Sequence, residues 1–213
     1  IPDANKMTEQ AQNALLKTIE EPPVYAIIIL LTENCDSLLP TIRSRCVTLT
    51  MNPVEKDKIC TYLENKFQLE PEQAQIAANY CQGNIGKAIR FASSSDFIEM
   101  KNQVLKLLKN LDSMDIASII DTIKEFSTHK NDINDYLDLM LLWYRDVLMF
   151  KVTKDANLLL YSDEYSAISE QATKRDYENI ENIIAAIDKA KVRLKANVNF
   201  DVTIELMILA MKD

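Results

Sequence analysis

Residues 136–150 read YLDLMLLWYRDVLMF, and this stretch decides the class of the fold. Its apolar side chains follow one another so closely that they point in nearly every direction around a helix. A helix that is apolar all round must be buried on more than one side, so we expect the central helix of a bundle. A cleft that holds a cofactor is the alternative interpretation.

The sequence on both sides of this stretch also favours helices. The 213 residues include only two glycines and six prolines, which leaves few tight turns. Asn52-Pro53-Val54-Glu55 is a good helix start, and the polar run Ser93 to Asp96 is the clearest linker. From this start onward we predict helices near 53–66, 70–83, 84–92, 97–110, 113–127, 131–154, 163–173, 176–195 and 198–212.

The last predicted helix ends in a strongly apolar run, Ile204 to Met211. Two uses for such a run are open. It closes the bundle, or it packs against another subunit.

The first fifty residues have a different pattern. Thr8 to Glu20 has apolar residues at helical spacing and is stopped by Glu21-Pro22-Pro23. Ala26 to Thr32 is a continuous apolar run rich in isoleucine, typical of a strand buried on both faces of a parallel sheet. Val47 to Met51 is a plausible further strand. These residues therefore indicate the end of an α/β unit whose earlier strands lie outside this sequence.

Composition narrows the classes of function. The net charge is -8 and the pI about 4.8, which argues against a protein that binds the phosphate backbone of nucleic acids through its own net charge. No apolar run approaches the ~20 residues of a membrane span, so we expect no membrane contact. The sequence begins at Ile1 without an initiator methionine, and we therefore expect a piece of a longer protein.

The four cysteines lie far apart in the sequence, and none belongs to a CxxC pair. With His129 as the single histidine, we expect no zinc or other metal site, and a reducing, cytoplasmic location fits best. The cysteines are Cys35, Cys46, Cys60 and Cys81.

Three stretches, in order along the chain, resemble one family. They are Asp3-Ala4-Asn5-Lys6-Met7-Thr8 with Gln12 to Pro23, then Leu31-Thr32-Glu33-Asn34 with Leu38 to Cys46, then Gly83 to Ala88. Together they resemble the AAA+ subunits of bacterial clamp loaders of DNA polymerase III, most specifically over residues 3–51. The resemblance implies a mainly α protein in three parts. These are the C-terminal part of an AAA+ α/β domain with two or three strands (1–51), a small helical lid domain (52–95) and a helical collar domain for oligomerisation (96–213).

The same resemblance indicates positions of the nucleotide site where this chain lacks the residue types that bind metal or nucleotide in the family. Pro2 and Asp3 match the Asp-Glu pair that serves the magnesium ion and the attacking water, and proline has no donor for a metal. Gly86 stands where ATP-hydrolysing relatives carry a lid arginine. Lys87 comes one residue later, on another helix face, and Arg90 one turn beyond. The phosphate-binding GxxxxGK[ST] loop is absent from this sequence.

Two polar residues end the predicted buried strand. Thr32 and Asn34 match the family position that senses the γ-phosphate. The alternative interpretation is a polar strand end beside a turn.

Ser44-Arg45-Cys46 is the most informative triplet. Family members place this arginine at a subunit edge, where it reaches into the nucleotide site of the neighbour. A guanidinium suits that role because it is always charged and forks across phosphate oxygens. The alternative is a solvated loop arginine. Arg43 is close by but does not align.

The resemblance thus implies a clamp-loader subunit that supplies Arg45 in trans and a collar for ring assembly, without hydrolysing ATP itself. It would be part of the DNA polymerase III holoenzyme, a nucleotidyltransferase complex. We expect no cofactor in this chain, and ATP with Mg²⁺ only at the interface with a neighbouring subunit. The expected partners are motor subunits (gamma- or tau-like), delta and, through the complex, the sliding clamp and primed DNA.

Two other functions remain open. An ATP-hydrolysing motor subunit of the same family is one alternative. An unrelated helical scaffold with chance motif matches is the other, and it predicts that residues 1–51 form no strand–helix–strand unit.

Overall fold

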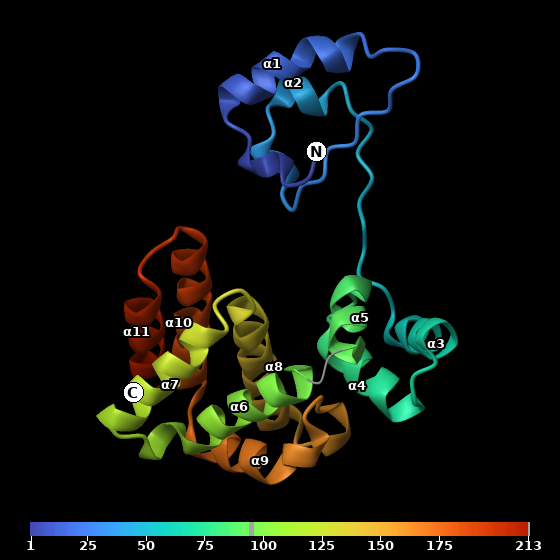
Figure 1. Cartoon of the computed structure of the whole chain (residues 1–213). Coiled ribbons are helices and arrows are strands. Elements are labelled where there is room, and N and C mark those ends of the chain that lie inside the picture. The colour runs from blue at the N-terminus through green and yellow to red at the C-terminus, as the bar shows by residue number, and fades with distance from the viewer. Residues whose placement is uncertain (94–95, 213) are drawn as a thin grey trace. The chain divides into compact units, whose positions relative to one another are not determined.

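A computed structural model describes residues 1–93 and 96–212. The chain divides into two compact units, Ile1–Asn52 and Pro53–Asp213, which Figure 1 shows as the blue part and the remaining part. The predicted linker from Ser93 to Asp96 contains residues 94 and 95, which lie outside the described residues, so the boundary there stays a prediction.

The second unit consists of helices in its described residues, as the sequence predicted. They are α3 (Lys56–Phe67), α4 (Pro71–Tyr80), α5 (Ile85–Ser93), α6 (Asp96–Asn110), α7 (Ile116–Thr128), α8 (Ile133–Thr153), α9 (Tyr165–Lys174), α10 (Tyr177–Lys195) and α11 (Phe200–Lys212).

Helix α8 is the central helix of this unit. It packs against α6, α9 and α10, and Figure 1 shows it inside the helices of the second unit. Leu137, Trp143, Tyr144 and Val147 on α8 are completely buried. The expectation of a central bundle helix is therefore confirmed.

Helix α11 meets the first of the two expectations for the last apolar run, and its packing against another subunit stays a prediction. Its side chains Ile204, Met207, Ile208 and Met211 are buried against the bundle, where α11 contacts α7 and α10. Its outer side chains Val202, Leu206 and Leu209 are between 42 and 48 % exposed. The helix thus closes the bundle and still offers an apolar outer face.

Helix α3 begins three residues later than the Asn52-Pro53 motif predicted, at Lys56 after the N-cap Glu55. The reason is a contact distant in sequence. The Val54 N–H donates to the Gly83 carbonyl oxygen at 3.0 Å, and a Cβ on Gly83 would lie 2.5 Å from Pro53 Cβ. Gly83 has φ +80°, a left-handed conformation that favours glycine at the end of a helix.

The first unit is built on α1 (Glu9–Glu20) and the short helix α2 (Pro40–Arg43), which contact each other. Thr8 caps α1, since its Oγ1 accepts from the Ala11 N–H at 3.2 Å. Gln12 on α1 is buried, and its side-chain amide joins α1 to the loop before α2: Oε1 accepts from the Leu39 N–H at 2.8 Å, and Nε2 donates to the Ser37 carbonyl oxygen at 3.3 Å.

The two predicted strands are not confirmed in the described residues of this unit. Segments 26–32 and 47–51 form no strand, and the prediction of burial on both faces fails as well. Every second apolar side chain of each segment is at least 58 % exposed. These side chains are Ile27, Ile29, Leu31, Val47, Leu49 and Met51.

The physical reason is the lack of strand partners. Leu31 exchanges two hydrogen bonds with the first residues of the chain: its N–H donates to the Ile1 carbonyl oxygen at 2.9 Å, and its carbonyl oxygen accepts from the Ala4 N–H at 2.8 Å. The two segments run in the same direction, so this is a very short parallel pairing. A strand needs a longer ladder, and the described residues do not provide one.

Across the described ranges, every helix is too short or too polar to cross a membrane.

Candidate functional site

Arg45 lies on the surface of the first unit, just after α2, and its side chain is 38 % exposed. Its Nε and Nη2 contact a single oxygen, Glu20 Oε1, at 2.7 and 2.6 Å. Its Nη1 donates to the Thr41 carbonyl oxygen at 2.9 Å. The guanidinium is thus accessible from outside and held on its inner side by its own chain.

The local sequence explains where Arg45 sits. Pro40 occupies the first turn of α2, where a missing N–H costs nothing. Ile42 on α2 is completely buried and anchors the helix against the unit. The helix ends at Arg43 with Ser44 as its C-cap, so Arg45 directly follows an anchored turn.

Arg43 has a different partner. Its Nη1 lies 2.9 Å from Asp36 Oδ1, and both side chains are largely exposed. The two neighbouring arginines are therefore each paired with their own carboxylate, and Arg43 offers a matched control for Arg45.

The structure brings the predicted sensor residues next to the predicted metal positions. Leu31, the residue before Thr32, bonds to Ala4, the residue after Asp3. Thr32 Oγ1 donates to the Asn34 carbonyl oxygen at 2.8 Å and accepts from the Asn34 N–H at 3.1 Å. Asn34 Oδ1 accepts from the Asp36 N–H at 2.8 Å. Both side chains stabilise a turn here, as the alternative interpretation expected, and their sensor role stays a prediction.

The loss of magnesium binding at Pro2 and Asp3 stays a prediction. Pro2 carries no metal donor, and the Asp3 carboxylate lies 3.1 Å from Lys6 Nζ. Asp3 also has φ +50°, unusual for a residue other than glycine. In the ranges 1–93 and 96–212, no three His, Cys, Asp or Glu side chains gather as metal ligands would.

A groove of about 440 Å³ lies in the first unit, and Thr32 is among the residues that line it. Its walls are residues 30–33 and 46–51, and Arg43 and Cys35 also line it. The groove separates the two segments that we expected to be strands.

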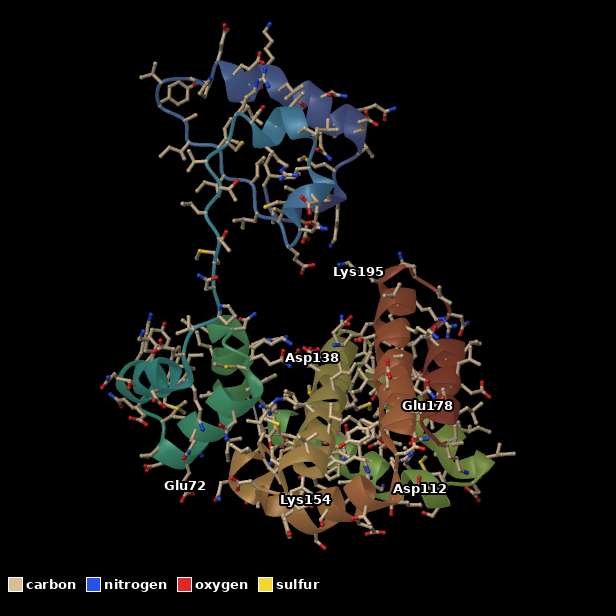
Figure 2. The ribbon with its side chains drawn as sticks, turned by 180° about the vertical axis from the view of Figure 1, so that it is seen from behind. Glu72, Asp112, Asp138, Lys154, Glu178 and Lys195 are labelled. Atoms are coloured by element: carbon tan, nitrogen blue, oxygen red, sulfur yellow. The ribbon has the colours of Figure 1, made fainter. Side chains whose placement is uncertain are left out.

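Gly86 lies exposed on α5 in the second unit. The basic residue after it, Lys87, turns toward α8: its Nζ contacts Asp138 and lies 2.9 Å from Asp135 Oδ1. Asp138 Oδ1 also lies 2.5 Å from Lys191 Nζ on α10, and Figure 2 marks Asp138 on α8. We name Lys87, Asp135, Asp138 and Lys191 the α8 ion cluster.

Electrostatics within the α8 ion cluster favour the charged forms. Burial disfavours a charged Asp138, but hydrogen bonds and charges of Lys191 and Lys87 outweigh it and lower the pKa of Asp138. Burial likewise disfavours a charged Lys87, and the two carboxylates outweigh it and raise the pKa of Lys87. Arg90 also points to α8, with Nη2 2.7 Å from Asp135 Oδ2.

Sequence reasoning missed this cluster. The available signal was the spacing of Asp132, Asp135 and Asp138, which places three carboxylates on one side of the start of α8. The basic residues of α5 were interpreted only in relation to nucleotide.

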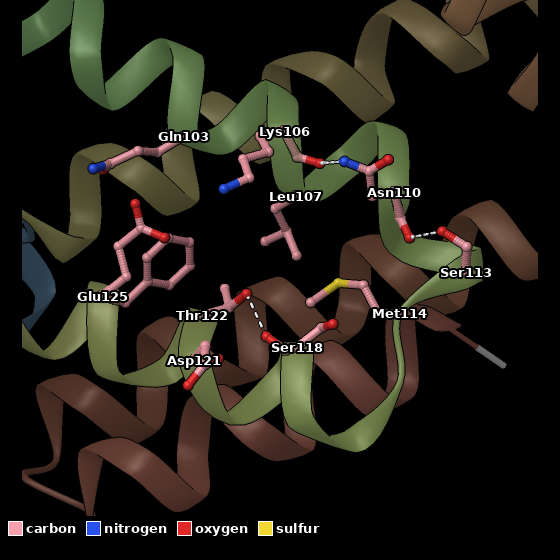
Figure 3. A pocket seen from close by; sticks show the side chains of 11 residues that line it. Gln103, Lys106, Leu107, Asn110, Ser113, Met114, Ser118, Asp121, Thr122 and Glu125 are labelled. Atoms are coloured by element: carbon pink, nitrogen blue, oxygen red, sulfur yellow. Dashed lines mark hydrogen bonds between the residues drawn. The ribbon is translucent and has the colours of Figure 1, made fainter.

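A second groove, of about 420 Å³, lies between α6 and α7 (Figure 3). Several of its polar side chains bond to the helix backbone beside them. Thr122 Oγ1 donates to the Ser118 carbonyl oxygen at 2.9 Å, and Asn110 Nδ2 donates to the Lys106 carbonyl oxygen at 2.9 Å. We therefore assign no site to this groove.

Comparison with known proteins agrees with the motifs. Residues 1–55 match a family model described as "DNA polymerase III, delta subunit". The whole chain is 32 % identical to DNA polymerase III subunit delta' of Bacillus subtilis (strain 168), and it spans 65 % of the length of that relative.

Two further relatives show how far the similarity extends. Subunit delta' of Escherichia coli (strain K12) is 34 % identical over 89 residues, which are 42 % of this chain and 27 % of the relative. Subunit tau of Bacillus subtilis (strain 168) is 25 % identical over 172 residues, which are 71 % of this chain and 31 % of the relative. Residues 1–51 form no strand–helix–strand unit, as the unrelated scaffold predicted, but the similarity along the whole chain excludes chance motif matches.

Proposed function

We propose that this chain, which is 32 % identical along its whole length to subunit delta' of DNA polymerase III from Bacillus subtilis (strain 168), works as a delta-prime-type subunit of a clamp loader. In this role it supplies Arg45 in trans to the ATP site of a neighbouring subunit. The observation that carries the proposal is the exposed guanidinium of Arg45, presented on an anchored turn within the region that matches the family.

The proposal assigns no ATP hydrolysis to this chain itself. Pro2 lacks a metal donor, the Asp3 carboxylate is paired with Lys6, and Gly86 has no side chain to contact a nucleotide. ATP and Mg²⁺ then act at the interface with the neighbour, where Arg45 stabilises the charge of the transferring phosphoryl group.

The remaining parts of the proposal concern assembly. Helices α6–α11 serve as the collar that joins the other loader subunits, gamma- or tau-like and delta. The exposed outer face of α11 supports this use. Through the complex the chain acts on the sliding clamp and primed DNA in the cytoplasm, as expected from its free thiols.

The test compares Arg45→Ala with Arg43→Ala in the complete protein, assembled with the motor subunits. We expect Arg45→Ala to lower DNA-stimulated ATP turnover at the neighbouring site by ~10³-fold, and Arg43→Ala to leave it within twofold. Both arginines sit in exposed ion pairs, so neither change should alter the melting temperature measurably. Unchanged turnover with Arg45→Ala would refute the role of this residue.

The second candidate function is a motor subunit that hydrolyses ATP itself, and the similarity to subunit tau favours it. ATP turnover by the complete protein alone, without other subunits, distinguishes the two. The delta-prime-type role predicts none.

A further inference from the structure

The carboxylate of Glu20 is the partner that holds the guanidinium of Arg45, across 25 residues of sequence. We propose that Glu20 is a positioning residue for Arg45: it fixes the direction of the guanidinium before the neighbouring subunit arrives. This inference rests on the proposed role of Arg45 in trans.

Glu20 lies at the carboxyl end of α1, where a carboxylate is stabilised only if a positive group lies close. It is the last residue of α1, and the following Glu21-Pro22-Pro23 prevents the helix from continuing. The carboxyl end of a helix carries partial negative charge, so a glutamate there is unfavourable unless a positive group lies close. Arg45 supplies that group, and the attraction orders both side chains.

The backbones of the two residues are held independently of the ion pair. Buried Gln12 bonds α1 to the backbone of Ser37 and Leu39, just before α2. Ile42, completely buried, anchors α2 itself. The separation between the end of α1 and Arg45 is therefore a property of the folded unit, and Glu20 acts on an arginine that already lies within reach.

The geometry leaves donors for a ligand. Nε and Nη2 share Glu20 Oε1, and Nη1 donates to the Thr41 carbonyl oxygen and, at 3.4 Å, to Ser44 Oγ. A guanidinium has five N–H donors, so part of the donor set stays available on a side chain that is 38 % exposed. An arginine held in this way has already lost much of its rotamer freedom, and less entropy is lost when it meets a phosphate.

The experiment uses the complete protein assembled with the motor subunits and measures kcat and KM for ATP at the neighbouring site. Glu20→Ala should lower kcat about tenfold or more, because a misplaced group loses catalytic effect, while KM stays within twofold. Glu20→Gln keeps an acceptor oxygen and should recover kcat to within about threefold of the wild type. Asp36→Ala, which breaks the neighbouring exposed pair with Arg43, is the matched control and should change neither constant by more than twofold.

The Arg45→Ala background separates positioning from a purely structural role. There, Glu20→Ala should cause no further loss of kcat, because the group it positions is gone. An equal loss in both backgrounds would show that Glu20 acts through the fold, and it would overturn the inference. A rise in turnover with Glu20→Ala would overturn it too, because Glu20 would then restrain Arg45 instead of orienting it.

The same data distinguish failure of this inference from failure of the proposed function. If Arg45→Ala lowers turnover and Glu20→Ala does not, only the positioning role of Glu20 is wrong. If Arg45→Ala itself has no effect, the proposed function fails, and the inference about Glu20 fails with it.

Discussion

Asp138→Asn is the substitution that tests the α8 ion cluster most directly. Asparagine keeps the shape of the side chain and removes its charge. Lys191 then loses the carboxylate at 2.5 Å, and Lys87 keeps only Asp135, whose Oδ1 lies 2.9 Å away. The change therefore leaves one partly buried ammonium without its acidic partner in this cluster.

The expected loss follows from the exposure of the groups. Exposed ion pairs contribute about 0–1 kcal/mol, whereas removal of one partner from a buried pair costs about 3–5 kcal/mol. Asp138 and Lys191 are 23 and 26 % exposed, so their pair lies between these limits. We expect the free energy of unfolding of the second unit to fall by about 2 kcal/mol, which lowers the melting temperature of a unit of this size by about 4–8 °C.

Thermal unfolding followed by circular dichroism at pH 7 measures the effect. Asp121→Asn is the matched control, because the Asp121–Lys124 pair joins two largely exposed side chains at 3.2 Å. We expect the control to melt within about 1 °C of the wild type. If Asp138→Asn also melts within this range, the dehydration of the cluster balances its attraction and the reasoning is refuted.

Two further predictions concern a backbone contact and the response to acid. Gly83→Ala should lower the free energy of unfolding by about 2 kcal/mol or more, because φ +80° strains alanine and its Cβ would lie 2.5 Å from Pro53 Cβ. In urea unfolding, the control Gly86→Ala on α5 should show no such loss, and equal midpoints for the two variants would contradict the explanation. Burial opposes a charged Asp112, but Lys174 and Arg175 outweigh it, so the pKa values of Asp112 and Asp138 are both lowered in the folded state. The two ion pairs stabilise the folded state fully above the pKa of an unfolded aspartate, and this stabilisation disappears as the pH falls through the lowered pKa of the folded state. At pH values below about 4, the urea concentration at the unfolding midpoint should therefore decrease, and it should decrease less for Asp138→Asn than for the wild type. Parallel pH profiles of the two proteins would contradict this assignment.

The helices were predictable because their signals are local. The apolar spacing in α8 and α11 and the near absence of glycine define where each helix lies to within a few residues. The start of α3 was missed because Val54 bonds to Gly83, a contact that no local pattern contains. The segment 26–32 was predicted as a strand from its composition, but a strand exists only with a partner, and composition does not report whether the partner is there.

For the candidate site, the sequence motif predicted which residue is important but not which residues contact it. The order of Leu39-Pro40-Thr41-Ile42 before Ser44-Arg45-Cys46 singled out Arg45, and the structure places it at the surface. Its partner Glu20 lies 25 residues earlier, and no spacing rule joins a helix end to a turn that follows another helix. Sequence similarity thus identifies the residue, whereas the way in which the residue is held requires coordinates.

The different ways in which the chain holds its basic residues support the choice of Arg45 as the group given to a neighbour. Lys87 contacts two carboxylates and is only 23 % exposed, so its removal from the α8 ion cluster would leave buried charge behind. Arg45 meets one carboxylate, and both partners are more than a third exposed, so their pair contributes at most about 1 kcal/mol. A phosphate group can bind the N–H donors that Glu20 and Thr41 leave free, because charge-assisted hydrogen bonds to phosphate are strong. Lys87 is therefore held in the joint between α5 and α8, whereas Arg45 keeps donors for the phosphate group of a neighbour.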